Sequence, residues 1–123
     1  LEPSADDRLS AKTENAVLEF LRAGPELSVD ALVRLYAPDL TLPAFSLLVS
    51  RWAHDLMRSA LGLQPRYFID ENAVIERLAA HTDAKRAAGF CTQALSCRRA
   101  ADHTLNPKQT VESVLLRYKQ IFQ

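Results

Sequence analysis

The fold is decided by residues 43–61, PAFSLLVSRWAHDLMRSAL, which form the most apolar helical stretch of the chain. Their apolar side chains cover more than half of a helix circumference, which predicts a helix packed on several sides. Pro43 fits the first turn of this helix because an N–H is not needed there. Gly62 predicts its end. We therefore expect a central helix over residues 43–61.

The rest of the chain shows further helical patterns and no convincing strand. Asn106 and Pro107 provide an N-cap and a first residue for a terminal helix whose apolar stripe must be buried. The fold class is therefore predicted to be all-α, a compact bundle of about six helices. The other expected helices are residues 7–22, a short one capped by Ser28 that ends before Pro38, one capped by Asp70 or Asn72, and residues 84–101, started by Thr82 or Asp83.

The helix expected over residues 84–101 presents mostly small residues, which favours close packing on a neighbouring helix. The stripe consists of Ala84, Ala87, Ala88, Cys91, Ala94 and Leu95. Cys91 lies on it and is predicted to be inert. Cys97, beside two arginines, is the better candidate for a lowered thiol pKa. The two cysteines point to opposite sides of the helix, so no disulfide between them is expected.

Length and charge limit the possible functions. The 123 residues suit one domain, with residues 1–7 as a linker remnant of a longer protein and residues 8–123 as a single helical domain. Fifteen basic and fifteen acidic residues cancel, which removes the broad positive field of nucleic-acid binding. No apolar stretch is long enough to span a membrane, so we expect a cytoplasmic protein.

The chain offers little that resembles a catalytic, cofactor or metal site. Its three glycines are isolated, so there is no phosphate-binding loop, and its three histidines are scattered. The acidic pairs Asp6-Asp7 and Asp70-Glu71 are interpreted as helix-start residues. An enzyme using Cys97 or His54 has no second catalytic group that we can name, since Asp55 is expected on another helix face than His54. We predict no catalytic residue, cofactor or metal.

The candidate functional residues are instead those of a partner interface. Arg98 and Arg99 either offset a helix dipole or anchor a contact with an acidic neighbour, and Arg117 adds to a basic surface on the C-terminal half. The connector aromatics Tyr67 and Phe68 either cover the core or dock onto a partner.

Three segments in this order resemble the C-terminal domain of the delta-prime subunits of bacterial DNA polymerase III. The likeness spans residues 44–122, although Thr104 stands where that family usually has proline. The segments are Ser50-Arg-Trp52-Ala-His-Asp55-Leu-Met, Leu63-Gln-Pro-Arg-Tyr-Phe68, and Arg99-Ala-Ala-Asp102-His-Thr-Leu105-Asn106-Pro107 leading to Glu112-Ser-Val-Leu-Leu-Arg-Tyr118.

The resemblance implies a collar domain of a clamp loader, the assembly that places the sliding clamp on primed DNA. Its partners would be the delta and gamma/tau subunits and its own N-terminal AAA+ domain. It implies no enzyme activity for this fragment, since the polymerase and ATPase activities belong to other parts of the assembly. The alternative from the residues alone is a stand-alone helical adaptor or a small-molecule-binding regulatory domain, which a large, closed apolar cavity would favour.

Overall fold

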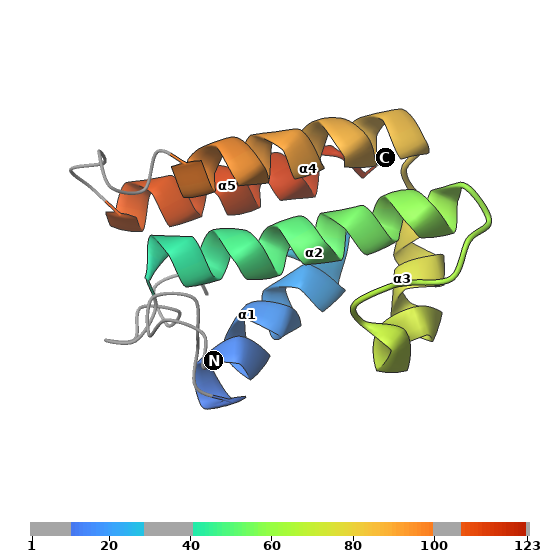
Figure 1. Cartoon of the computed structure of the whole chain (residues 1–123), viewed down its shortest axis with the longest axis horizontal. Coiled ribbons are helices and arrows are strands. Elements are labelled where there is room, and N and C mark those ends of the chain that lie inside the picture. Colours follow the sequence, from blue (N-terminus) through green and yellow to red (C-terminus); the bar gives the residue numbers. More distant parts are fainter. Residues whose placement is uncertain (1–10, 29–40, 100–106, 123) are drawn as a thin grey trace.

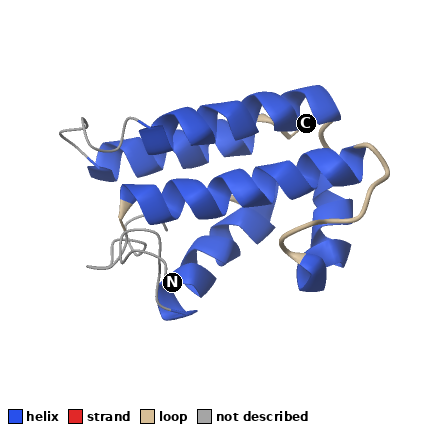
Figure 2. Ribbon diagram, in the orientation of Figure 1, coloured by secondary structure: helices blue, strands red, loops and turns tan. Residues whose placement is uncertain are grey.

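The computed structural model describes residues 11–28, 41–99 and 107–122, and gives only the backbone of residues 97–99 and 107. Within these ranges the chain is helical, with no strand (Figure 2). The all-α prediction is confirmed. The helix predicted between Ser28 and Pro38 and the linker over residues 1–7 lie outside the described ranges, which hold five α-helices: α1 Ala11–Ala23, α2 Leu42–Ala60, α3 Asn72–Ala79, α4 Ala84–Arg99 and α5 Pro107–Gln120.

Local side-chain chemistry fixes several helix ends. The Thr41 hydroxyl accepts the N–H of Ala44 at 3.3 Å and caps α2, with Pro43 in the first turn. The carboxylate of Asp83 accepts the N–H of Arg86 at 2.8 Å at the start of α4. At the end of α2, Gly62 adopts a positive φ of 81°, and the N–H of Leu63 reaches back to the carbonyl of Arg58 at 2.8 Å. This pattern satisfies the last carbonyls of the helix.

The start of α3 differs from the prediction. A 3-10 turn, Ile69–Glu71, leads directly into α3, and no side chain caps either element. The expectation that Asp70 or Asn72 caps α3 is therefore wrong. The reason is that residues 69–71 already form a 3-10 turn that runs directly into the first turn of α3. The residue before α3 therefore does not have the extended conformation of a capping residue.

Helix α2 runs through the middle of the molecule, with α4 and α5 along one side and α1 and α3 on the other (Figure 1). Its most extensive contact is with α4, as the small-residue stripe predicts. Ala87 and Ala94 of that stripe are fully buried, but Leu95 is exposed. The stripe as predicted omits Phe90, which is buried beside Tyr118 of α5, with 5.4 Å between the ring centroids.

A buried chain of hydrogen bonds ties three helices together at the centre of the core. The indole Nε1 of Trp52 in α2 donates to the hydroxyl of Tyr118 in α5 at 3.0 Å, and that hydroxyl donates to the carbonyl of Leu21 in α1. All three side chains are fully buried. Burial raises the pKa of Tyr118, which keeps its hydroxyl protonated and able to donate. These bonds satisfy polar groups that would otherwise destabilise the core.

Two glycines should respond in opposite directions to alanine. Gly24 has a φ of 56°, and a Cβ there would lie 2.5 Å from Cδ2 of the buried Leu78. We expect Gly24→Ala to destabilise the fold by about 1–2 kcal/mol. Gly89, inside α4 with open space around it, is the matched control, and Gly89→Ala should stabilise by about 0.5–1 kcal/mol. Urea unfolding followed by circular dichroism measures both, and equal shifts of the two midpoints would contradict the backbone geometry.

Candidate partner-binding surface

The connector between α2 and α3, residues 61–69, concentrates exposed apolar side chains. Among the described residues, six large hydrophobic side chains are exposed, and four of these belong to the connector. Their exposed fractions are 59% for Leu61, 48% for Leu63, 44% for Tyr67 and 68% for Ile69. Exposed apolar side chains grouped in this way mark interaction sites more often than scattered ones do. Figure 2 shows the connector leaving the end of α2 and turning back toward α3.

Asp55 fixes the second half of this connector to α2. Its carboxylate is fully buried and accepts the backbone N–H groups of three successive residues. The distances are 2.8 Å from Arg66, 3.0 and 3.3 Å from Tyr67, and 2.8 Å from Phe68. Hydrogen bonds to a carboxylate are stronger than those between neutral groups. The position of residues 66–68 therefore depends directly on one side chain of α2.

Two further contacts hold the connector in place. The ring of Phe68 is half-buried and packs edge-on against the indole of Trp52, with 5.3 Å between their centroids. The guanidinium Nε of Arg58 donates to the carbonyl of Gln64 at 2.7 Å. Of the two roles predicted for the connector aromatics, Phe68 covers the core, whereas Tyr67 remains exposed. The connector is thus fixed at several points along its length.

Tyr67 is the centre of a cluster of cationic and aromatic groups, which we call the Tyr67 cluster: Tyr67, Arg51, Arg66 and His54. The guanidinium carbons of Arg51 and Arg66 lie 5.2 and 5.7 Å from the centre of the tyrosine ring. The imidazole of His54 meets the same ring edge-on at 5.5 Å. Distances of this size allow cation–π attraction. The exposed aromatic ring of the connector therefore lies within 6 Å of two guanidinium groups.

Arg117, another predicted interface residue, does not join this cluster. Arg117, on α5, lines a groove of about 420 Å³ between α4 and α5, together with Arg86, Gln93 and Gln120. Arg98 and Arg99 belong to the last turn of α4, and their side chains are beyond what the structure describes. Tyr67, by contrast, contacts His54 and Arg51 of α2. The structure thus leaves Tyr67 exposed on the connector, packs Phe68 on the core and assigns Arg117 to a second surface.

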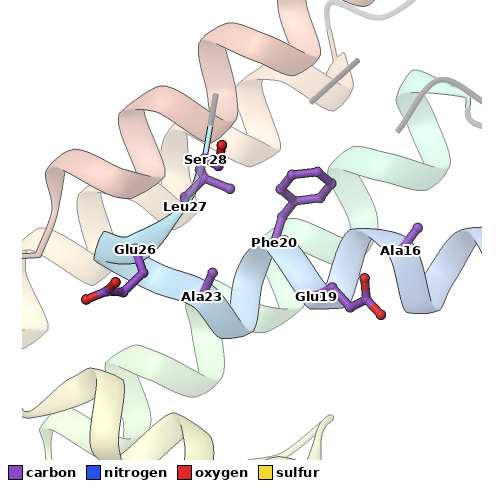
Figure 3. Close-up of a pocket in the computed structure, with 7 residues that line it drawn as sticks. All are labelled: Ala16, Glu19, Phe20, Ala23, Glu26, Leu27 and Ser28. Carbon is purple, nitrogen blue, oxygen red and sulfur yellow. The ribbon is translucent and has the colours of Figure 1, made fainter. Parts of the chain in front are cut away.

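A groove of about 300 Å³ lies beside α1 and is open to solvent (Figure 3). In Figure 3 the ring of Phe20 projects from α1 on the side of Leu27 and Ser28, while Glu19 and Glu26 point away from it. Ser28 is the last described residue before the gap at 29–40. This groove is not an enclosed apolar cavity, so it gives no support to the small-molecule alternative.

The acidic pair Asp70-Glu71 lies at a helix start as expected, because both residues belong to the 3-10 turn that leads into α3, and the carboxylate of Glu71 also pairs with Arg22 of α1 at 2.6 Å. His54 and Asp55 are adjacent in α2, and Nδ1 of the imidazole lies 3.7 Å from Oδ1 of the carboxylate. Among the described residues that nitrogen has no hydrogen-bond partner, and the Asp55 carboxylate instead accepts backbone N–H groups of the connector. The pair is therefore not an acid–base couple in this geometry.

Cys91 is partly buried, and its Sγ donates to the carbonyl of Ser50 at 3.5 Å. Burial raises the pKa of this thiol, so the reactive thiolate is scarcer than in a free cysteine. In a Cys97→Ser background at pH 8, we expect Cys91 to react with a disulfide reagent at least about tenfold more slowly in the folded than in the urea-unfolded chain. Equal rates in the two states would contradict the burial of this sulfur.

Sequence reasoning missed Arg51, Arg66 and the role of Asp55. Arg66 could have been noticed as a cation beside Tyr67 in an apolar connector. Arg51 carries no such signal, because only the folding of the connector back onto α2 brings it to the tyrosine.

Within the described ranges, no group of three or more His, Cys, Asp or Glu side chains is arranged to hold a metal, and no helix has the length and apolarity needed to cross a bilayer. No protein-family model, curated protein or solved structure matches the chain.

Proposed function

We propose that this chain is a subunit-joining domain that binds partner proteins through the α2–α3 connector. The observation that carries the proposal is the combination of exposure and fixation in residues 61–69. The connector exposes four large hydrophobic side chains, and it is also tied to α2 by Asp55, Arg58 and Phe68. An interface that is already ordered before binding loses less conformational entropy when the partner arrives.

We further propose that the assembly is the collar of a bacterial clamp loader, with this chain as the C-terminal domain of its delta-prime subunit. The support is the resemblance of residues 44–122 to that family, together with how the resembling residues contact one another. Trp52 bonds to Tyr118 and packs on Phe68, and Asp55 holds the backbone of residues 66–68. The three segments of the resemblance thus include residues that form one structural unit.

A ring of homologous but different subunits needs two unlike surfaces on each member, because its contacts are heterologous. The chain offers two candidates. One is the largely apolar connector, and the other is the groove between α4 and α5, where Arg86, Arg117 and Gln120 are found. This pairing of surfaces is consistent with a position between the delta and gamma/tau subunits.

Size-exclusion chromatography tests the proposal. The chain is mixed with the delta and gamma/tau subunits of its own organism, first singly and then together, and full-length delta-prime is the positive control. We expect the chain to elute with at least one of them. If full-length delta-prime forms the complex and the folded chain does not, the subunit-joining role in a clamp loader is wrong.

A further inference from the structure

The two arginines of the Tyr67 cluster carry positive charge that no carboxylate among the described residues neutralises. Neither Arg51 nor Arg66 makes an ion pair within the described part of the chain, and both are exposed. Asp55 is the carboxylate next to the cluster, but it is fully buried and its oxygens accept the N–H groups of residues 66–68. An anion from outside can therefore approach both guanidinium groups.

The tyrosine ring also attracts the two arginines. Each guanidinium lies within 6 Å of the ring centre, close enough for attraction to its face. Arginine and tyrosine are enriched among the residues that contribute most to protein interfaces. A guanidinium group binds carboxylates with two parallel hydrogen bonds, which gives directional recognition. The geometry of the cluster thus suits carboxylates placed beside an apolar surface.

We propose that the Tyr67 cluster binds an acidic segment of a partner protein, with carboxylates on Arg51 and Arg66 and apolar side chains against Tyr67 and Ile69. This inference rests on the proposed function, since it names the chemistry of the partner at the connector. Nucleic acid is the other anionic class. It fits less well because the chain has equal numbers of basic and acidic residues, and because the neighbouring exposed side chains of the connector are aliphatic.

The test compares charge reversal at the cluster with charge reversal elsewhere. The double variant Arg51→Glu/Arg66→Glu is paired with Arg77→Glu, which changes an exposed arginine of α3 outside the cluster. Circular dichroism first establishes that the variants are folded. Dissociation constants for the delta and gamma/tau subunits are then measured at low and at high salt.

We expect the double variant to bind its partner at least about tenfold more weakly, and Arg77→Glu to bind as the unchanged chain does. The difference should shrink at high salt, because exposed charges are screened. If the unchanged chain binds the subunits and the double variant binds equally well, the acidic-segment inference is wrong and the subunit-joining role stands.

A second probe decides the inference when neither subunit binds. A labelled peptide of alternating glutamate and leucine is titrated into the chain, and a short oligothymidylate serves as the competing anion. We expect peptide binding that is lost in Arg51→Glu/Arg66→Glu and retained in Arg77→Glu. No peptide binding, or tighter binding of the oligothymidylate through the same arginines, would overturn the inference.

Discussion

Replacing Trp52 with alanine should destabilise the fold by about 3–5 kcal/mol, one of the largest losses that a single substitution can cause in this chain. The indole is fully buried in α2, packs on Phe68 and donates to the hydroxyl of Tyr118. Alanine would leave a cavity and would remove the donor that links α2 to α5. Natural domains are stable by only about 5–15 kcal/mol in total, so the variant should be close to unfolding at moderate temperature.

Tyr118→Phe separates the two contributions of Trp52. Phenylalanine keeps the ring packing on Phe90 and Phe122 but removes the hydroxyl that joins Trp52 to Leu21. The loss should be about 1–3 kcal/mol, because a buried indole N–H and a buried carbonyl each lose a partner. Unfolding in urea is followed by circular dichroism for both variants. Tryptophan fluorescence does not serve, because Trp52 is the one tryptophan of the chain and is removed in one of them. A loss below about 1 kcal/mol for Trp52→Ala would contradict its central position.

Replacing Asp55 with alanine should have the second largest effect, on stability and on binding together. The substitution removes the acceptor of three backbone N–H groups, and we expect a loss of about 2–3 kcal/mol. Tyr67 would no longer be held beside Arg51. The affinity for the partner should therefore fall even at temperatures where the helical signal is intact, because binding must then order the connector.

Arg58→Ala is the control for the Asp55 variant. Arg58 also bonds to the connector, but through one exposed hydrogen bond to the carbonyl of Gln64. Its removal should lower the free energy of unfolding by no more than about 1 kcal/mol and should leave the affinity almost unchanged. If Asp55→Ala binds the partner as tightly as Arg58→Ala does, the ordered connector is not what the partner recognises.

The helical elements could be predicted from the sequence because their signals are local. The apolar run of residues 43–61, the cap at Thr41 and the turn at Gly62 act within a few residues, and α2 begins and ends within a residue of its prediction. The start of α3 could not be predicted in the same way. Asp70 reads locally as a cap, but a 3-10 turn precedes α3 and leaves no side-chain cap there.

The candidate site was predicted only in part, because it depends on contacts between distant residues. Tyr67 could be singled out as an aromatic in a short connector. Its partner Arg51 lies on a helix, where the charge reads as an ordinary exposed side chain, and Asp55 reads as a polar residue in an apolar run. Their roles arise when the connector folds back onto α2. The sequence prediction therefore named the connector and missed the side chains of α2 that support it.

Photo-crosslinking from position 67 tests most directly whether the connector contacts a partner. Tyr67 is replaced by benzoylphenylalanine, and the same group replaces Arg77 of α3 as the control. The chain is irradiated with the delta and gamma/tau subunits. Our account predicts a covalent product with a subunit from position 67 and little from position 77. Crosslinking from position 77 alone, with a complex that forms normally, would contradict it.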